Sequence, residues 1–144
     1  MVGKSGTILF LCTGNAIRSQ MAEGFARAIF PPEWRIYSAG ILASGVQPMT
    51  VEVMREAGID ISGQRSKRVN DVPVEEIDHL ITLCGHARET CPNLPHVRYK
   101  EHWPIDDPMD TVSTPDERKV FRRTRDDIRP RVEGLREKLA GGDA

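Results

Sequence analysis

The three cysteines of the chain lie in two short segments that could carry out thiol chemistry. The first segment, LCTGNAIRSQ, holds Cys12 and, six positions later, Arg18. The second, LCGHARETCP, holds Cys84 and Cys91 seven positions apart. A thiolate is both a nucleophile and a partner in disulfide exchange. The cysteines could therefore be packing residues, metal ligands, a static disulfide or a working redox pair.

The segment after Cys12 has the composition of a loop that binds a tetrahedral oxyanion. Successive backbone N–H groups between a strand and a helix form a concave nest, and the helix dipole adds to it. Arg18 provides a planar fork for two anion oxygens, and Gly14 lets the backbone turn tightly. The same donors favour the thiolate of Cys12, which makes it the predicted nucleophile. Asn15 and Ser19 are expected to brace the loop. The predicted oxyanion-binding residues are Thr13, Gly14, Asn15, Ala16, Ile17, Arg18 and Ser19.

Strand and helix patterns alternate along the whole chain. The predicted strands are 7–11, 34–38, 78–83 and 97–99, and the predicted helices are 19–30, 48–57, 74–77 and about 115–140. Such alternation implies a parallel sheet with helices on both faces. The expected fold is a three-layer α/β domain with a four-stranded parallel sheet in the flavodoxin-like order 2-1-3-4. In that order Cys12 and Cys84 follow neighbouring strands and should face one crevice.

The last helix carries its own boundary signals. Thr114 is the predicted N-cap, with Glu117 as its capping-box partner three residues later. Pro130 lies inside the pattern and should kink the helix or break it in two.

Composition excludes several function classes. The 144 residues carry a net charge of −1, and 39% are hydrophobic, which predicts one globular domain over residues 1–144. The arginines of residues 118–131 alternate with acids at helical spacing, so we expect a solvated helix face and no nucleic-acid partner. No membrane-length apolar run or secretory signal is present. A cytoplasmic, reducing location and a monomer are expected.

The spacing of Cys84 and Cys91 argues against a static disulfide. If residues 84–91 are helical, they rise about 10.5 Å, whereas a disulfide needs Cα atoms within about 7 Å. A transient bond formed with a conformational change is physically reasonable. Metal binding is the other alternative, since His86, His96 and His102 lie near both cysteines. Their spacing is unlike that of a zinc knuckle, and no metal is expected.

Several segments resemble one known superfamily over nearly the whole chain. CTGNAIRSQMAEG resembles the phosphate loop and first helix of the low-molecular-weight protein tyrosine phosphatases. The segments WRIYSAG, AGIDIS, TLC…CP and EHWPIDDP are similar to its thioredoxin-coupled arsenate reductase branch. The resemblance implies an arsenate reductase with thioredoxin as external reductant and no bound cofactor. The alternative is a phosphatase that hydrolyses phosphomonoesters through a cysteinyl-phosphate.

The resemblance also implies roles for the second half of the chain. The acid is the aspartate directly before proline, here Asp107, with Asp106 in support and Trp103 as a wall of the pocket. In the implied cascade Cys12 attacks arsenate and water is lost. Cys84 then attacks the Cys12 sulfur and releases arsenite. Cys91 attacks Cys84, and thioredoxin reduces the Cys84–Cys91 disulfide.

Three positions depart from one branch or the other. Ala16-Ile17 stands where the reductases often have Ser-Cys, so a loop hydroxyl is lost and Ile17 removes the backup cysteine of the phosphatases. Met109 follows Asp107-Pro108 where phosphatases usually carry tyrosine, which favours the reductase.

A potassium site described by the resemblance is matched only in part. Three of its ligands are present as Asn15, Glu23 and Ser38, but Lys67 takes the place of the aspartate. The lysine ammonium can occupy the cation position itself, so we expect no dependence on potassium.

Overall fold

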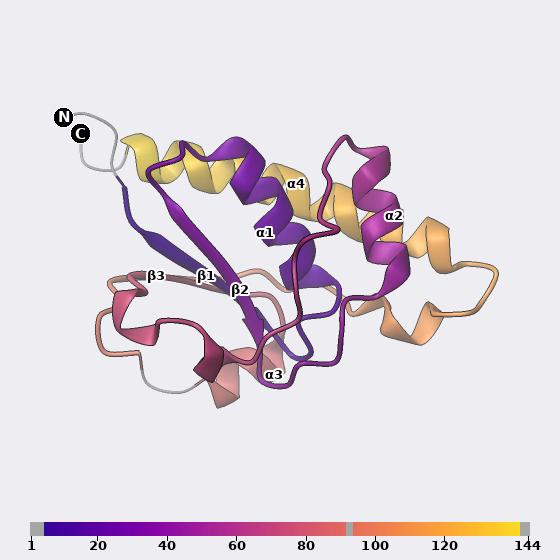
Figure 1. Ribbon diagram of the computed structural model, residues 1–144, viewed down its shortest axis with the longest axis horizontal. Helices are drawn as coiled ribbons and strands as arrows, with labels where there is room; N and C mark the ends of the chain where they lie inside the picture. Colours follow the sequence, from indigo (N-terminus) through magenta and orange to yellow (C-terminus); the bar gives the residue numbers. More distant parts are fainter. Residues whose placement is uncertain (1–4, 92–93, 142–144) are drawn as a thin grey trace.

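The computed structural model describes residues 5–91 and 94–141. Its centre is a four-stranded parallel sheet in the order β2-β1-β3-β4 (Figure 1). The strands are β1 (Thr7–Cys12), β2 (Arg35–Gly40), β3 (His79–Thr82) and β4 (Tyr99–His102). The predicted fold class and strand order are confirmed.

Helices cover both faces of this sheet. The four α-helices are α1 (Arg18–Ile29), α2 (Pro48–Glu56), α3 (Gly85–Thr90) and α4 (Glu117–Gly141). Three short 3-10 turns are η1 (Val69–Asp71), η2 (Val74–Glu76) and η3 (Pro108–Thr111). Figure 1 shows α1 and α4 over one face and α3 on the other. Within the described residues, no helix is both long and apolar enough to cross a bilayer.

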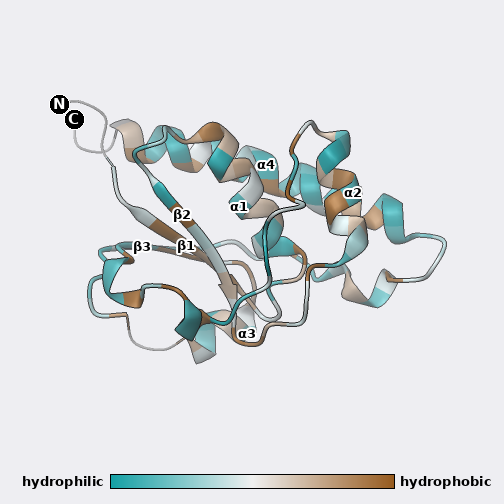
Figure 2. Cartoon of the chain, viewed as in Figure 1, coloured by the Kyte–Doolittle hydropathy of each residue, from teal (hydrophilic) through white to brown (hydrophobic). Residues whose placement is uncertain are grey.

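The central strand β1 is buried at every position because both of its faces are covered. Ile8 and Phe10 pack into the cluster under α1 and α4, whereas Leu9 and Leu11 pack into the cluster on the α3 side. Figure 2 shows hydrophobic and hydrophilic residues alternating along α4, whose apolar face lies on the first cluster. Alternate side chains of β1 therefore pack against opposite layers. The carboxyl end of β1 leads into the loop that carries the candidate site.

Two predictions about the C-terminal half are wrong. The fourth strand is Tyr99–His102, whereas residues 97–99 were predicted. The last helix begins at Glu117, and the hydroxyl of Thr114 accepts the N–H of Asp116 at 3.3 Å, so the predicted capping box is absent. That contact spans two residues, which is the geometry of a turn before the helix.

Helix α4 also runs without a break through Pro130. Pro130 has no N–H, so the Asp126 carbonyl four residues earlier lacks its helical hydrogen-bond donor. Both Pro130 and Asp126 are exposed. Water can satisfy that carbonyl on the solvent side of the helix, so the missing hydrogen bond does not divide the helix.

Candidate active site

The loop of residues 13–17 joins the end of β1 to the start of α1, and a second loop holds it from outside. We call residues 41–47, which follow β2, the strap. Four of its N–H groups donate to loop carbonyls: Ile41 to Cys12 (3.1 Å), Leu42 to Thr13 (2.9 Å), Ser44 to Gly14 (2.9 Å) and Gln47 to Ala16 (3.1 Å). The C=O and N–H of a planar trans peptide point in opposite directions. The N–H groups of residues 13, 14, 15 and 17 therefore point away from the strap.

Close approach of the strap depends on Gly40. A Cβ there would clash with the Leu42 carbonyl oxygen and lie 2.7 Å from the Asn15 nitrogen, and backbone atoms cannot move aside cheaply. Gly14 has a different role from the predicted one. The left-handed turn of the loop is at Asn15 (φ 50°), and the space beside Gly14 is taken by the Ser44 hydroxyl.

Asn15 is fully buried and holds the loop through its side chain. Its Nδ2 donates to the hydroxyls of Ser19 (2.8 Å) and Ser38 (2.9 Å). Its Oδ1 accepts from Gln20 Nε2 (2.9 Å) and from the backbone N–H of Lys67 (2.8 Å). Asn15 therefore braces the loop through these four hydrogen bonds, which compensate for the cost of its left-handed backbone conformation.

The thiol of Cys12 lies on the inner side of the loop, with its Sγ 2.8 Å from the Ser19 hydroxyl. That hydroxyl already accepts a hydrogen bond from Asn15, so its own hydrogen is free to point at the sulfur. A donor aimed at the sulfur stabilises a thiolate more than a thiol. The arrangement is suited to a nucleophilic Cys12.

Arg18 and Asp107 meet beside the loop. The Arg18 side chain is buried, and its Nη1 donates to the carbonyl of Ile105 at 3.0 Å. Its Nη2 lies 3.3 Å from Oδ2 of Asp107, whose side chain is 49% exposed and also accepts the N–H of Met109 at 3.1 Å. A cation that can bind an oxyanion and a carboxyl that can donate a proton therefore lie side by side.

The structure does not bring every predicted residue to the Arg18–Asp107 pair. Trp103 is only 4% exposed and packs on the Phe10 ring, with centroids 5.8 Å apart, so it belongs to the core. The prediction that it walls the pocket is wrong. Asp106 is exposed and precedes Asp107 in the same loop.

Cys84 reaches the loop from the neighbouring strand β3. It is the N-cap of α3, and its Sγ accepts the N–H of Ala87 at 3.3 Å. The same sulfur lies 3.1 Å from the hydroxyl of Thr13, the residue that follows Cys12. The expected meeting of the two strand ends thus places a second thiol against the oxyanion loop.

Cys91 lies at the other end of α3, as its C-cap. No disulfide joins any two of Cys12, Cys84 and Cys91 in this structure. Burial raises the pKa of the Cys91 thiol, and the nearby Lys100 ammonium opposes that effect. Because residues 85–90 are helical, a Cys84–Cys91 disulfide requires α3 to unwind.

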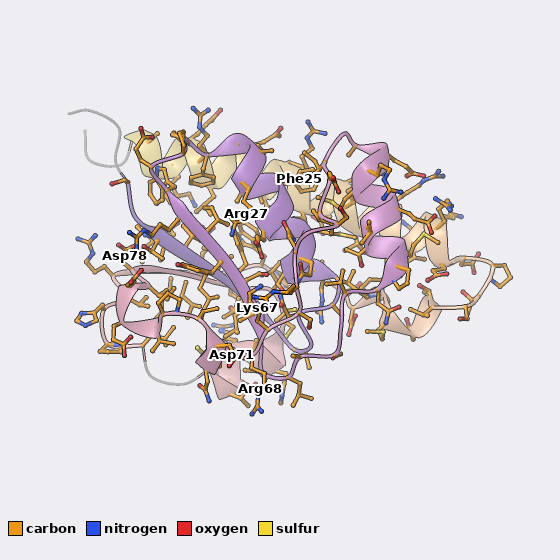
Figure 3. All side chains as sticks on the ribbon, in the orientation of Figure 1. Phe25, Arg27, Lys67, Arg68, Asp71 and Asp78 are labelled. Atoms are coloured by element: carbon orange, nitrogen blue, oxygen red, sulfur yellow. The ribbon has the colours of Figure 1, made fainter. Side chains whose placement is uncertain are left out.

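A buried carboxylate lies behind the loop. Glu23 is 4% exposed; its Oε1 accepts from Ser38 at 2.6 Å and its Oε2 from Arg27 Nε at 2.8 Å. The Lys67 Nζ lies 3.7 Å from Oε1 and donates to the Arg65 carbonyl at 2.8 Å. Arg27 and Lys67 are labelled in Figure 3. Burial lowers the pKa of Lys67, and the Glu23 charge opposes this. A lysine ammonium thus adjoins the residues that were compared with a potassium site.

Metal ligation was the other sequence alternative for the cysteines and histidines. Among the residues that the structure describes, no three His, Cys, Asp or Glu side chains are grouped so as to hold a metal ion. His102, one of the histidines considered, pairs its Nδ1 with the hydroxyl of Thr82 at 2.8 Å.

The strap is the main feature that sequence reasoning missed. Its contacts are made by backbone N–H groups, which any residue type except proline supplies. In the sequence, the strap is marked by two glycines. Gly40 allows its close approach, and Gly45 adopts a positive φ of 89°.

The strand–loop–helix arrangement around Cys12 and Arg18 defines a class of oxyanion-binding proteins. The chain belongs to the low molecular weight phosphotyrosine protein phosphatase family, whose model matches residues 7–142.

Comparison with individual relatives narrows the similarity further within this family. An arsenate reductase of Halalkalibacterium halodurans is 47% identical over 131 residues, which cover 90% of this chain and 94% of the relative. The solved structure of an arsenate reductase in the phosphate binding state has a TM-score of 0.75 and 35% identity, covering 93% of this chain and 98% of that one. The YwlE arginine phosphatase from Geobacillus stearothermophilus has a TM-score of 0.76 and 26% identity, with coverage of 93% and 92%.

Proposed function

We propose that this protein reduces arsenate to arsenite through its three cysteines and that thioredoxin reduces the resulting disulfide. The single observation that carries the proposal is the 3.1 Å contact between Thr13 Oγ1 and Cys84 Sγ. It sets a second thiol beside the nucleophile loop, which a phosphatase does not need. The high identity to a named arsenate reductase supports the same choice.

The first step uses the loop and the Arg18–Asp107 pair. The loop N–H groups and the Arg18 guanidinium bind the arsenate oxygens, and the Cys12 thiolate attacks arsenic. Asp107 donates a proton to the departing oxygen, which leaves as water. Arg18 is held by the Ile105 carbonyl, so its guanidinium is positioned before the anion arrives.

Two thiol exchanges complete the reduction. The Cys84 thiolate attacks the Cys12 sulfur, and the electron pair of the S–As bond stays on arsenic. Arsenic passes from As(V) to As(III) and leaves as arsenite, and a Cys12–Cys84 disulfide forms. Cys91 then attacks the Cys84 sulfur as α3 unwinds, which frees the Cys12 thiolate and leaves a Cys84–Cys91 disulfide. Two electrons from thioredoxin return that disulfide to two thiols.

Phosphomonoester hydrolysis is the second candidate. Cys12, Arg18 and Asp107 would serve a cysteinyl-phosphate as well as an arsenate adduct. The likeness to an arginine phosphatase favours keeping this alternative. In it Cys84 and Cys91 would be dispensable.

The deciding experiment compares the wild type with Cys91→Ser and Cys84→Ser. Arsenate turnover is followed by NADPH oxidation with thioredoxin and thioredoxin reductase, and hydrolysis of an aryl phosphate is measured on the same samples. We expect both variants to lose multiple-turnover arsenate reduction while retaining hydrolysis of the aryl phosphate. Unchanged arsenate turnover in Cys91→Ser would reject the cascade. Efficient hydrolysis with no arsenate turnover in the wild type would establish the phosphatase instead.

A further inference from the structure

A cavity of about 500 Å³ lies on the α3 side of the sheet, and neither Cys12 nor Arg18 is among its lining residues. Its lining includes Leu80 of β3, Cys91 and Arg88 of the α3 region, Leu94, and Lys100 and His102 of β4. This volume falls within the range of small-molecule sites. The mechanism proposed above uses Cys91 but leaves this cavity without a role.

The cavity has an excess of positive charge near the thiol. Within residues 5–91 and 94–141, neither Arg88 nor Lys100 forms an ion pair. Lys100 is close enough to Cys91 to favour its thiolate against the effect of burial. Both cations are therefore available to a ligand, and Lys100 lies near the thiol that would react.

The one carboxylate in the lining is already neutralised. Glu101 accepts hydrogen bonds from Lys138 Nζ (2.6 Å), Trp103 Nε1 (2.8 Å) and the Tyr99 hydroxyl (3.0 Å). Successive side chains of a strand point to opposite faces, so Lys100 and His102 share one face of β4, and Glu101 lies on the other with these partners. The cavity side of the strand is thus cationic.

The strand wall of the cavity does not depend on α3. Lys100 and His102 lie on β4, which is paired with β3, and the His102 ring is held by the Thr82 hydroxyl at 2.8 Å. If α3 unwinds to allow a Cys84–Cys91 disulfide, these strand residues keep their positions. The wall can then serve the oxidised form as well as the reduced form.

We propose that this cavity binds small thiols that carry a carboxylate, and that such a thiol reduces the Cys84–Cys91 disulfide directly by attack on Cys91. Lys100 and His102, which β4 holds in place, contact the carboxylate, and Leu80 of β3 contacts the carbon chain, while Arg88 adds a second positive charge to the cavity. The proposal rests on the function proposed above and adds a second class of reductant to it, independent of thioredoxin.

The reaction balances with two thiols. The first thiolate attacks the Cys91 sulfur, forms a mixed disulfide with it and expels the Cys84 thiolate, which takes up a proton. The second thiolate attacks the sulfur of the bound thiol, releases a small symmetrical disulfide and frees the Cys91 thiolate. The protein gains two electrons and the two thiols lose two.

The test uses three thiols of similar size and different charge: 3-mercaptopropionate, 2-mercaptoethanol and cysteamine. The substrate is the full-length Cys12→Ser variant oxidised with diamide, in which only the Cys84–Cys91 disulfide can form. Rate constants for its reduction are corrected for the thiolate fraction of each reagent and are divided by the rate constants of the same thiols with an uncharged small-molecule disulfide, because thiolate nucleophilicity also rises with the pKa of the thiol. Because no arsenate is involved, failure of the arsenate chemistry and failure of this proposal are distinguishable.

We expect 3-mercaptopropionate to react about tenfold faster than cysteamine at low ionic strength, since one or two uncompensated cations lie near the sulfur. Lys100→Gln and Arg88→Gln should each reduce this ratio, and succinate should slow the anionic thiol alone. Lys119→Gln, on the exposed face of α4, is the matched control and should leave the ratio unchanged.

Equal corrected rates for the three thiols would overturn the proposal, as would an anionic preference that survives the double variant Lys100→Gln/Arg88→Gln. Slow reduction by every small thiol together with fast reduction by thioredoxin would also overturn it, because the cavity would then have no role as a thiol site.

Discussion

The Thr13 hydroxyl lies 3.1 Å from the Cys84 sulfur, although the two residues are 71 positions apart in the chain. β1 and β3 are neighbours in the sheet, and each delivers one thiol at its carboxyl end. Thr13 therefore joins the loop that is proposed to hold the oxyanion to the residue that is proposed to remove the product. The pairing of β1 with β3 thus creates the contact on which the proposed redox chemistry depends.

Removal of that hydroxyl should slow the second thiol step more than the first. Thr13→Val loses one hydrogen bond to sulfur, worth about 1 kcal/mol or roughly a fivefold change in rate. In a single-turnover experiment we expect arsenite release to slow by about this factor, with little change in the concentration of arsenate that half-saturates the protein. Thr90→Val, which removes a hydroxyl at the far end of α3, is the control. Equal behaviour of the two variants would deny Thr13 this role.

Replacement of Asn15 should disable the loop. Asn15→Ala loses four side-chain hydrogen bonds and leaves an alanine at a positive φ. We expect unfolding free energy to fall by about 2 kcal/mol or more and arsenate turnover to fall at least about 100-fold. Asn15→Gly separates the two causes because glycine tolerates the backbone angle. Recovery of activity in Asn15→Gly would show that the side-chain bonds are unimportant.

Lys67 should make the protein indifferent to potassium. Its ammonium lies 3.7 Å from the buried Glu23 carboxylate, next to the residues that resemble potassium ligands. We expect the same turnover in potassium and sodium buffers of equal ionic strength. Lys67→Gln removes that charge and should lower the melting temperature by a few degrees, because Glu23 keeps only Arg27 as a cationic partner. Activation of the wild-type protein by potassium would contradict this account.

The junction of α2 and α4 should weaken in acid. The hydrogen bond from Arg122, with further contacts from Arg125 and Arg118, lowers the pKa of Glu56 from 4.5 to about 2. A carboxyl whose pKa is lower in the folded than in the unfolded state stabilises the fold most at a pH above its pKa in the unfolded state. That contribution is lost as the pH falls from about 4.5 to about 2.

We therefore expect Glu56→Gln to lower the urea midpoint at pH 7 and to differ less from the wild type at pH 3. Glu133→Gln is the control, since Glu133 pairs with Arg129 on the same helix and, among the described residues, with no cation of α2. A Glu56→Gln effect that is as large at pH 3 as at pH 7 would refute the assignment.

The sheet order was predictable because its inner strands are strongly patterned. β1 is a continuous apolar run, and the helical pattern after Cys12 forces a crossover to β2. β4 was misplaced because an edge strand with the sequence YKEH has little apolar signal, and its pairing with β3 sets its position instead. The break predicted at Pro130 is absent because the residue is exposed, and the sequence pattern does not show whether a helical proline faces solvent.

The site was predictable where chemistry requires particular residue types. Cys12 and Cys84 follow β1 and β3, whose ends were expected to meet, and the Cys84 sulfur contacts Thr13 as that expectation requires. The strap was not predictable, because backbone N–H groups make its contacts. Trp103 was misassigned because its ring could face either side of β4, and only its packing on Phe10 decides which.

The most direct test of the three-cysteine cascade is the identity of the disulfide that arsenate leaves in the protein. One equivalent of arsenate is added to reduced Cys91→Ser in the absence of any reductant, the thiols are blocked, and the peptides are mapped without reduction. The account predicts a Cys12–Cys84 disulfide with one equivalent of arsenite released, and a Cys84–Cys91 disulfide when the wild type is treated in the same way. Release of arsenite without a Cys12–Cys84 disulfide, or no arsenite at all, would contradict it.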